Sequence, residues 1–493
     1  VRDHSRLSLA RAAELVLRAQ PQQAEEYLQA VEQRLAAGPL DPNLLGQLYT
    51  LRARNAQRSN QLAAALEWSE RALHVLPAEN LLARSQATLY MGNAFVFADR
   101  VVDAILAFAE AGQLAQQAGD IHTALHALCN QGIMQITHGQ LHQGAATFAT
   151  GLALAKEHQV EQITMVGAHE ANLATILYEW DRLEEAEARF RAAIAKYDHS
   201  TDGATKVLLR GHLALLLNAH GDHPGARQLI ARLLAQGRQQ KLPEVRLLAG
   251  VAIQLRLWMR QGETTAVLSW LRSCGLQVDD ELSVLNYYGY NSLARALLHV
   301  GRLEEAAHLC ARLVAAAAAS GRQRAWIELR ALQALTWQAQ GKAEAARQLL
   351  ADTLRQAEPA GYIRTFVDEG EAMRLLILEC RFWLARQTPA AQQGRLLAYV
   401  DRLLAAFAPA NQGEREGASL AHPPSQNLVD PLSERELEVL RLAYEGLSNP
   451  QIATQLNVVV GTVKRHINNI FSKLGVTSRT QALARGRELG LLP

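Results

Sequence analysis

The sequence predicts an all-α protein, built as a solenoid of helical repeats followed by a small domain of four helices. Three observations predict this class. A turn followed by a small residue recurs about every 40 residues over most of the chain. Each period holds two stretches with the apolar spacing of amphipathic helices. Near the C-terminus this pattern stops, and four shorter helical stretches follow a segment rich in Pro, Gly and Ser.

Each repeat is marked by a turn that begins with Gly, Asp or Asn, and a small residue follows five positions later. The turns begin at Asn60, Asp99, Gly139, Asp181, Gly221, Gly262, Gly301 and Gly341, at intervals of 39 to 42 residues. The residues five positions later are Ala65, Ala104, Gly144, Ala186, Ala226, Val267, Ala306 and Ala346, of which only Val267 is not small. A small side chain lets two antiparallel helices approach closely, so each period predicts an αα-hairpin.

Hairpins of this kind cannot bury both of their apolar faces alone, so they must stack into a solenoid with a concave surface. The array resembles tetratricopeptide-type repeats, and we expect a tetratricopeptide-like helical-repeat domain over residues 1–407. Residues 357–377, AEPAGYIRTFVDEGEAMRLLI, also resemble the end of the repeat domain in the large MalT-like regulators of the LuxR superfamily. That resemblance implies that the concave face receives a small-molecule inducer or a partner protein.

The large regulators of this kind carry an ATPase module ahead of the repeats. The sequence shows no phosphate-binding loop, because the segment at Gly341 has a lysine but neither the upstream glycine-rich loop nor a following Ser or Thr. A fragment of a longer protein and a naturally short relative both remain open.

Overall charge is nearly balanced, with 50 Lys and Arg against 48 Asp and Glu, so a nucleic-acid site must come from local segregation of charge. The cysteines are far apart and form no CxxC pair: they are Cys129, Cys274, Cys310 and Cys380. This spacing argues against a zinc knuckle or a disulfide framework. The N-terminal residues do not resemble a signal peptide and no apolar stretch is long enough for a membrane span, so we expect a cytoplasmic protein without a membrane partner.

Residues 408–430 are rich in Pro, Gly, Ser and Asn and predict a flexible linker. The domain at 431–493 follows it. Ser433 and Glu436 form a capping-box pattern for its first helix, which Gly446 ends. Asn449 as the N-cap and Pro450 in the first helical position then predict a short second helix.

The third helix, about residues 462–473, has one apolar and one polar face. Its core face is predicted to hold Val463, Ile467, Ile470 and Leu474, and its outer face Arg465, Asn468, Asn469 and Ser472. The chain has no Asp or Glu from Gly446 to Arg487, whereas six cations lie there: Lys464, Arg465, Lys473, Arg479, Arg485 and Arg487. Because a carboxylate would repel phosphates, an acid-free basic segment is typical of a nucleic-acid interface.

A helix, a turn and a polar-faced second helix form a helix-turn-helix unit, whose second helix enters the major groove of DNA. Residues 431–493 resemble the LuxR-type DNA-binding domain along their whole length. The resemblance implies that Lys464, Arg465 and Asn468 contact base edges, and that the DNA backbone is contacted or the reader supported by Thr462, His466, Lys473 and Arg479. Val463 and Asn469, from the same helix, complete the candidate set. The family usually has Ser where this chain has Val459, so a contact just before the recognition helix is expected to be lost.

The sequence therefore predicts a DNA-binding transcriptional regulator, and we expect an activator. Its expected partners are double-stranded DNA, RNA polymerase and an inducer or protein on the repeat domain, with a homodimer on paired half-sites. We expect no enzymatic activity, catalytic residue, cofactor or metal. His122, His126, His138 and His142 around Cys129 have metal-compatible spacing, but ordinary helix histidines explain them better.

Two other readings of the C-terminal domain remain. It could be a protein-binding bundle, which would make the chain a helical-repeat scaffold without DNA binding. LSERELEVLRLAYEG also resembles the promoter-reading end of sigma factors, but such a factor needs a second promoter-melting domain that a solenoid does not provide.

Overall fold

The computed structural model describes residues 2–18, 20–37, 41–59, 61–197, 200, 203–282, 287–387, 390–407, 434–444 and 447–456, together with Val463, His466, Ile467, Asn469, Ile470 and Ala482. The chain divides into two compact units, Val1–Ala410 and Asn411–Pro493. Every regular element among the described residues is a helix, which confirms the predicted all-α class. The predicted linker, 408–430, lies outside the described residues.

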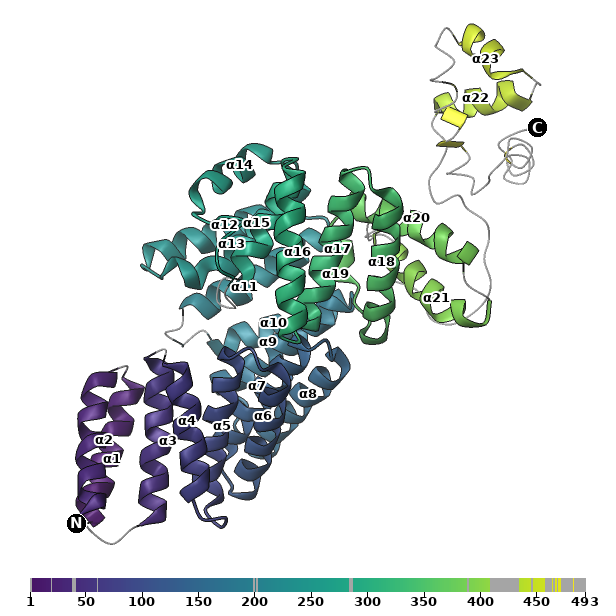
Figure 1. Ribbon diagram of the computed structural model, residues 1–493. Coiled ribbons are helices and arrows are strands. Elements are labelled where there is room, and N and C mark those ends of the chain that lie inside the picture. Colours follow the sequence, from purple (N-terminus) through teal and green to yellow (C-terminus); the bar gives the residue numbers. More distant parts are fainter. Residues whose placement is uncertain are drawn as a thin grey trace. The chain divides into compact units, whose positions relative to one another are not determined.

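The first unit is a stack of antiparallel helices (Figure 1). Its helices are α1 (Arg2–Leu17), α2 (Pro21–Ala36), α3 (Pro42–Arg58), α4 (Leu62–Val75), α5 (Leu81–Phe97), α6 (Val101–Gln117), α7 (Ile121–Thr137), α8 (Leu141–Glu157), α9 (Thr164–Glu179), α10 (Leu183–Tyr197), α11 (Gly203–Ala219), α12 (His223–Gln239), α13 (Glu244–Arg260), α14 (Thr264–Ser273), α15 (Tyr287–His299), α16 (Leu303–Ala319), α17 (Gln323–Ala339), α18 (Ala343–Ala357), α19 (Arg364–Val367), α20 (Glu371–Gln387) and α21 (Ala390–Ala406). The second unit contains α22 (Glu434–Tyr444) and α23 (Asn449–Gln455). No helix of the described chain combines the length and the apolar character needed to cross a membrane.

The predicted turns end the first helix of each hairpin. Their leading residues have φ between 59° and 88°, the left-handed region: Asp99, Gly139, Asp181, Gly221, Gly262, Gly301 and Gly341. Glycine enters this region without steric cost, and the short polar side chain of Asp tolerates it. The next amide then bonds back to the helix, as when Arg100 N donates to the Phe95 carbonyl at 2.9 Å. Asn60, the first predicted turn residue, lies outside the described residues.

The residues five positions after the turns are all buried, which confirms the predicted close approach of the paired helices. Their solvent exposure is 0% for Ala65, Ala104, Ala186, Ala226, Val267, Ala306 and Ala346. Gly144 is buried as well. Val267 shows that the position tolerates a larger apolar side chain on the short helix α14.

The end of the repeat region folds back onto helices that lie much earlier in the sequence. A single turn of 3-10 helix, Glu358–Ala360, and the short helix α19 pack against the end of α9. Trp180 Nε1 donates to the Ala360 carbonyl at 2.9 Å, and Ile363 N donates to the Glu179 carbonyl at 3.0 Å. The contact therefore joins segments about 180 residues apart.

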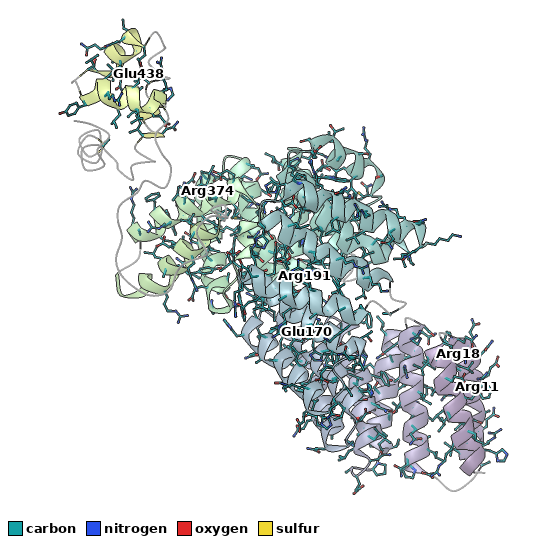
Figure 2. The ribbon with its side chains drawn as sticks, turned by 180° about the vertical axis from the view of Figure 1, so that it is seen from behind. Arg11, Arg18, Glu170, Arg191, Arg374 and Glu438 are labelled. Atoms are coloured by element: carbon teal, nitrogen blue, oxygen red, sulfur yellow. The ribbon has the colours of Figure 1, made fainter. Side chains whose placement is uncertain are left out.

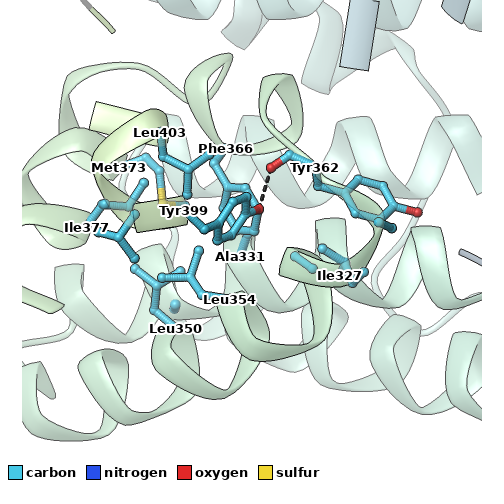
Figure 3. Packing of buried hydrophobic residues seen from close by; sticks show 14 of the residues in the cluster. Ile327, Ala331, Leu350, Leu354, Tyr362, Phe366, Met373, Ile377, Tyr399 and Leu403 are labelled. Carbon is cyan, nitrogen blue, oxygen red and sulfur yellow. Dashed lines mark hydrogen bonds between the residues drawn. The ribbon is translucent and has the colours of Figure 1, made fainter. Parts of the chain in front are cut away.

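This part of the chain, residues 358–368, is called the return segment. It is anchored by the largest apolar core of the unit. Tyr362, Phe366 and Tyr399 are fully buried, and the Tyr399 hydroxyl donates to the Tyr362 carbonyl (Figure 3). A second contact joins α7 to the turn before α17, where His138 Nδ1 lies 3.0 Å from the Gly321 carbonyl oxygen. The middle and the end of the repeat array are thus one packed body.

Candidate functional site

The candidate DNA-binding unit begins with two helices, of which the second, α23, has a capped N-terminus. Gln451 Oε1 accepts hydrogen bonds from Ser448 N at 2.8 Å and from Ser448 Oγ at 2.7 Å. Ser448 is therefore the N-cap of α23, and the prediction of Asn449 was wrong by one residue. Pro450 still lies in the first turn, where its missing N–H costs nothing. Ile452 is fully buried in the apolar core of this unit.

Helix α22 is fastened to the end of α23. Arg435 donates to the Leu456 carbonyl at 2.9 Å and to Glu438 at 2.6 Å. The first bond satisfies a carbonyl at the C-terminus of α23, where a cation also complements the helix dipole. Glu438 is exposed (Figure 2), and α22 also carries Glu434 and Glu436, whereas the stretch from Gly446 to Arg487 has no acid.

The described residues of the third predicted helix have their apolar side chains in the core. Val463 is 0% and Ile470 is 1% exposed, and Ile467 packs partly buried against the same cluster of α22 and α23 side chains. This confirms the predicted inward face. The Val463 side chain has no surface to offer a base edge, so any contact of this residue with DNA has to come from its backbone.

The polar residues of this helix are described only in part. Asn469 is exposed, as predicted for the outer face, and His466 is half-buried with its Nδ1 screened from solvent and without a hydrogen-bond partner. This places His466 at the core edge. The other candidate residues lie outside the described residues: Thr462, Lys464, Arg465, Asn468, Lys473 and Arg479.

Family comparison agrees with both units. The model of the MalT-like TPR region matches residues 46–381, more than half of the chain. The model of the luxR family of bacterial regulatory proteins matches residues 430–485. The chain belongs to the MalT-like regulators of the LuxR family.

Curated relatives of this MalT-like chain carry the name HTH-type transcriptional regulator MalT. The one from Yersinia pestis (strain Pestoides F) is 29% identical over 480 residues, which covers 92% of this chain and 50% of that protein. The one from Yersinia pseudotuberculosis serotype O:1b (strain IP 31758) gives the same values. The chain thus spans about half the length of the curated relatives that it matches.

Two solved structures of Rap proteins are similar to the chain. The Rap conjugation gene regulator of plasmid pLS20 in complex with the Phr* peptide is 15% identical, with 74% of this chain and 97% of that chain covered and a TM-score of 0.48. A Rap protein complexed with competence and sporulation factor is 12% identical, with 83% and 100% covered and a TM-score of 0.47.

The repeat unit of this MalT-like regulator contains a cavity of about 380 Å³ between its helices, partly open to solvent. It is lined by side chains of α7, α9, α11, α13, α15 and α17, together with Arg322 from the turn before α17. Its charged lining residues are Arg256, Arg295, Arg322, Arg324 and Glu328. Sequence reasoning predicted a concave surface but missed these residues. The available clue was α17, where Arg324 and Glu328 stand four apart in a helix that is otherwise mostly apolar.

Glu328 is the central carboxylate of the cavity wall. It pairs with Arg256 and, at 3.0 Å, with Arg295, and it accepts a hydrogen bond from the Tyr287 hydroxyl at 3.1 Å. Burial alone would raise the pKa of Glu328, but the surrounding guanidiniums outweigh burial and lower the pKa to about 2. Glu328 is therefore ionised at neutral pH.

Two of the histidines considered for a metal, His138 and His142, have other partners. His142 stacks on Trp180 with ring centroids 4.8 Å apart, and His138 faces the Gly321 carbonyl. Burial raises the pKa of the Cys129 thiol to about 12, so this group stays protonated at neutral pH. Within the described part of the chain, no three His, Cys, Asp or Glu residues group closely enough to hold a metal ion.

Proposed function

We propose that the chain is a DNA-binding transcriptional regulator. In this proposal a helical-repeat domain, residues 1–407, is joined through a flexible linker, 408–430, to a helix-turn-helix domain at 431–493. The observation that carries the proposal is the inward packing of Val463 and Ile470. With these side chains in the core, the period of 3.6 residues per turn predicts that Arg465 and Asn468 lie on the outer face together with exposed Asn469.

The charge of the segment supports contact with a phosphate backbone. From Gly446 to Arg487 the chain has six Lys and Arg and no acid. Such a surface gains free energy by releasing counterions from DNA, and no carboxylate opposes the approach. Base specificity in this proposal comes from Lys464, Arg465 and Asn468, because guanidinium, ammonium and amide groups match base edges in the major groove.

The regulatory part of the proposal follows the family. The relatives are named transcriptional regulators, and we extend that role to an activator that recruits RNA polymerase and binds paired half-sites as a homodimer. The repeat domain receives an inducer or a partner protein in its interior. The chain itself acts by binding and not by catalysis.

Substitutions in the third helix test the DNA-binding role. Lys464→Ala or Asn468→Ala should reduce discrimination between the operator and unrelated duplex by about 1–3 kcal/mol for each lost base contact. Lys473→Ala should weaken binding to all duplexes alike, because a phosphate contact carries no sequence information. Fluorescence anisotropy with an operator selected from genomic fragments measures both effects. Unchanged affinity and discrimination in folded variants would rule out this helix as the reader.

Salt dependence separates this function from a scaffold without DNA binding. A reader that contacts phosphates should lose affinity for unspecific duplex steeply and linearly on a log–log plot of affinity against salt. A protein-binding bundle would show no duplex binding at low salt. The measurement needs only the full chain and a duplex of random sequence.

A further inference from the structure

We infer that the cavity of the repeat unit binds a small organic anion, and that Arg324 is the residue that holds its carboxylate or phosphate group. The inference rests on the proposed function, since it names the chemical class of the inducer that the repeat domain receives. It is carried by the pairing of the charged side chains that line the cavity.

Three of the four cavity arginines already have carboxylate partners. Arg256 and Arg295 share Glu328, and Arg295 also pairs with Glu369 at 2.6 Å. Arg322 Nε donates to Asp99 Oδ1 at 2.6 Å, which ties α17 to the turn between α5 and α6. These three guanidiniums therefore already form ion pairs that link the helices of the cavity wall.

Arg324 differs from its neighbours. Within the described chain it makes no hydrogen bond and no ion pair within 4 Å, although its side chain lies in the cavity wall. Burial alone would lower the pKa of Arg324, but the more distant charges of Glu179 and Glu328 raise it overall, so the group stays charged. Desolvation of a half-buried guanidinium costs free energy, and a contacting anion would offset that cost.

The remaining wall is suited to an organic ligand with an apolar body. Ile133, Leu208 and Ile253 supply apolar surface, and Tyr287 and Tyr288 form an edge-to-face pair with centroids 5.9 Å apart. Asn172 and Thr175 of α9 add polar groups to the lining. A volume of about 380 Å³ lies within the range of sites for small molecules.

The cavity lies between two parts of the repeat unit that are far apart in the sequence. Its wall combines α7 and α9 with α15 and α17, the elements that the return segment and the Arg322–Asp99 pair bring together. An anion on Arg324 would add one more charge contact between these two parts of the array. Ligand binding should therefore stabilise the unit against unfolding.

Matched pairs of probes test for anion selectivity with the full chain at constant ionic strength. We expect benzoate to bind more tightly than benzamide, or phenyl phosphate more tightly than phenol, by at least about tenfold in Kd, because charge-assisted hydrogen bonds to a half-buried guanidinium are strong. Isothermal titration measures the four values, and the two anions separate a carboxylate from a phosphate ligand. Failure of both anions to bind, or equal binding of charged and neutral partners, would overturn the inference.

Variants of Arg324 locate the binding. Arg324→Met should weaken the preferred anion at least about tenfold, and Arg324→Lys should retain part of the affinity because the charge remains. Arg232→Met is the control, since Arg232 is exposed on α12 and does not line the cavity. If Arg324→Met binds the anion as well as wild type, the assignment fails. If Arg324→Met does not fold, the comparison of the probe pairs on the wild type and on Arg324→Lys tests the assignment instead.

Binding of duplex DNA by the same preparation keeps this result separate from the proposed function. Salt-sensitive duplex binding without anion binding would overturn the inference and leave the regulator intact. Anion binding without duplex binding would support the cavity and count against the DNA-binding role.

Discussion

At the scale of single residues, His212 is a titratable group whose surroundings shift its pKa clearly within the pH range that experiments can reach. Its Nδ1 lies 2.9 Å from the Leu208 carbonyl oxygen, and its ring stacks on Phe190 with centroids 4.8 Å apart. Burial lowers the pKa of His212 to about 4, with the charge of Arg324 acting in the same direction and the Leu208 carbonyl opposing it. His212 is therefore neutral in the folded protein at pH 7.

This shift predicts acid sensitivity with a definite window. The pKa of His212 is lower in the folded state than the reference value of about 6.5, so the unfolded state binds more protons between these values. Stability due to neutral His212 is present above about pH 6.5 and is lost as the pH falls to about 4, by an amount on the order of 3 kcal/mol. His212→Gln, which cannot titrate, should flatten the fall of urea midpoints between pH 7 and 4. An unchanged slope would contradict the assignment.

At the scale of the helical element, successive repeats fit a large side chain against a glycine on the paired helix. A Cβ on Gly92 of α5 would lie 2.6 Å from the Phe108 ring of α6, and one on Gly132 of α7 would lie 2.5 Å from the Phe148 ring of α8. Both pairs recur at a spacing of 40 residues. In the next repeat Ala174 takes the place of the glycine and packs in one buried cluster with Phe190, so the paired helices are separated there by only one additional methyl group.

Gly132→Ala should therefore destabilise the repeat unit although alanine favours helices. The new methyl would overlap the fully buried Phe148 ring, and overpacking of this kind costs about 1–3 kcal/mol, against about 1 kcal/mol gained in helix propensity. Gly112→Ala on α6 is the matched control, because its Cβ would meet its nearest neighbour at an ordinary 3.6 Å. Thermal unfolding of the full chain should show a lower melting temperature for Gly132→Ala and an equal or higher one for Gly112→Ala. The reverse order would show that the ring moves freely.

At the scale of the whole repeat unit, the contact of the return segment with α9 and the turn after it depends on a buried charged cluster. Arg364 is 4% exposed and pairs with Asp368 and, at 3.2 Å, with Asp181. The Tyr178 hydroxyl donates to Asp368 Oδ2 at 2.8 Å. Glu179, also buried, accepts from Thr365 N at 2.8 Å, so α9 provides partners for both Thr365 and Asp368.

Removal of the central cation should open this contact. Arg364→Met would remove the closest cation of buried Asp368, which keeps only the longer pair with Arg260 at 3.4 Å among the described residues, and this loss costs up to about 3–5 kcal/mol. Amides that bridge the two segments, such as Ile363 N and Thr365 N, should exchange with deuterium faster, whereas amides of α1–α4 should not change. Arg374→Met is the control, because Arg374 pairs with exposed Glu371 on the surface of α20 (Figure 2) and such pairs contribute at most about 1 kcal/mol. Equal exchange in both variants would mean that the cluster does not hold the contact.

The sequence by itself determined the features that follow from local periodicity. The turns at Asp99 and Gly301 and the buried small residues after them were predicted, because a left-handed turn and a close helix pair select residue types at fixed spacing. The inward face of Val463 and Ile470 followed from the helical period alone. The N-cap at Ser448 was missed by one residue, because Asn and Ser are nearly equal as caps and only the bonds to Gln451 distinguish them.

Only the tertiary structure decided which repeats meet. Arg364 and Asp181 are 183 residues apart, and each belongs to a segment that reads as an ordinary helix end. The same holds for Arg324, because the side chains that α9, α13 and α15 place around it decide that it has no contacting partner among the described residues. Local spacing determines which side of a helix is buried. The pairing of charges across the interior depends instead on the sum of the small rotations between successive repeats.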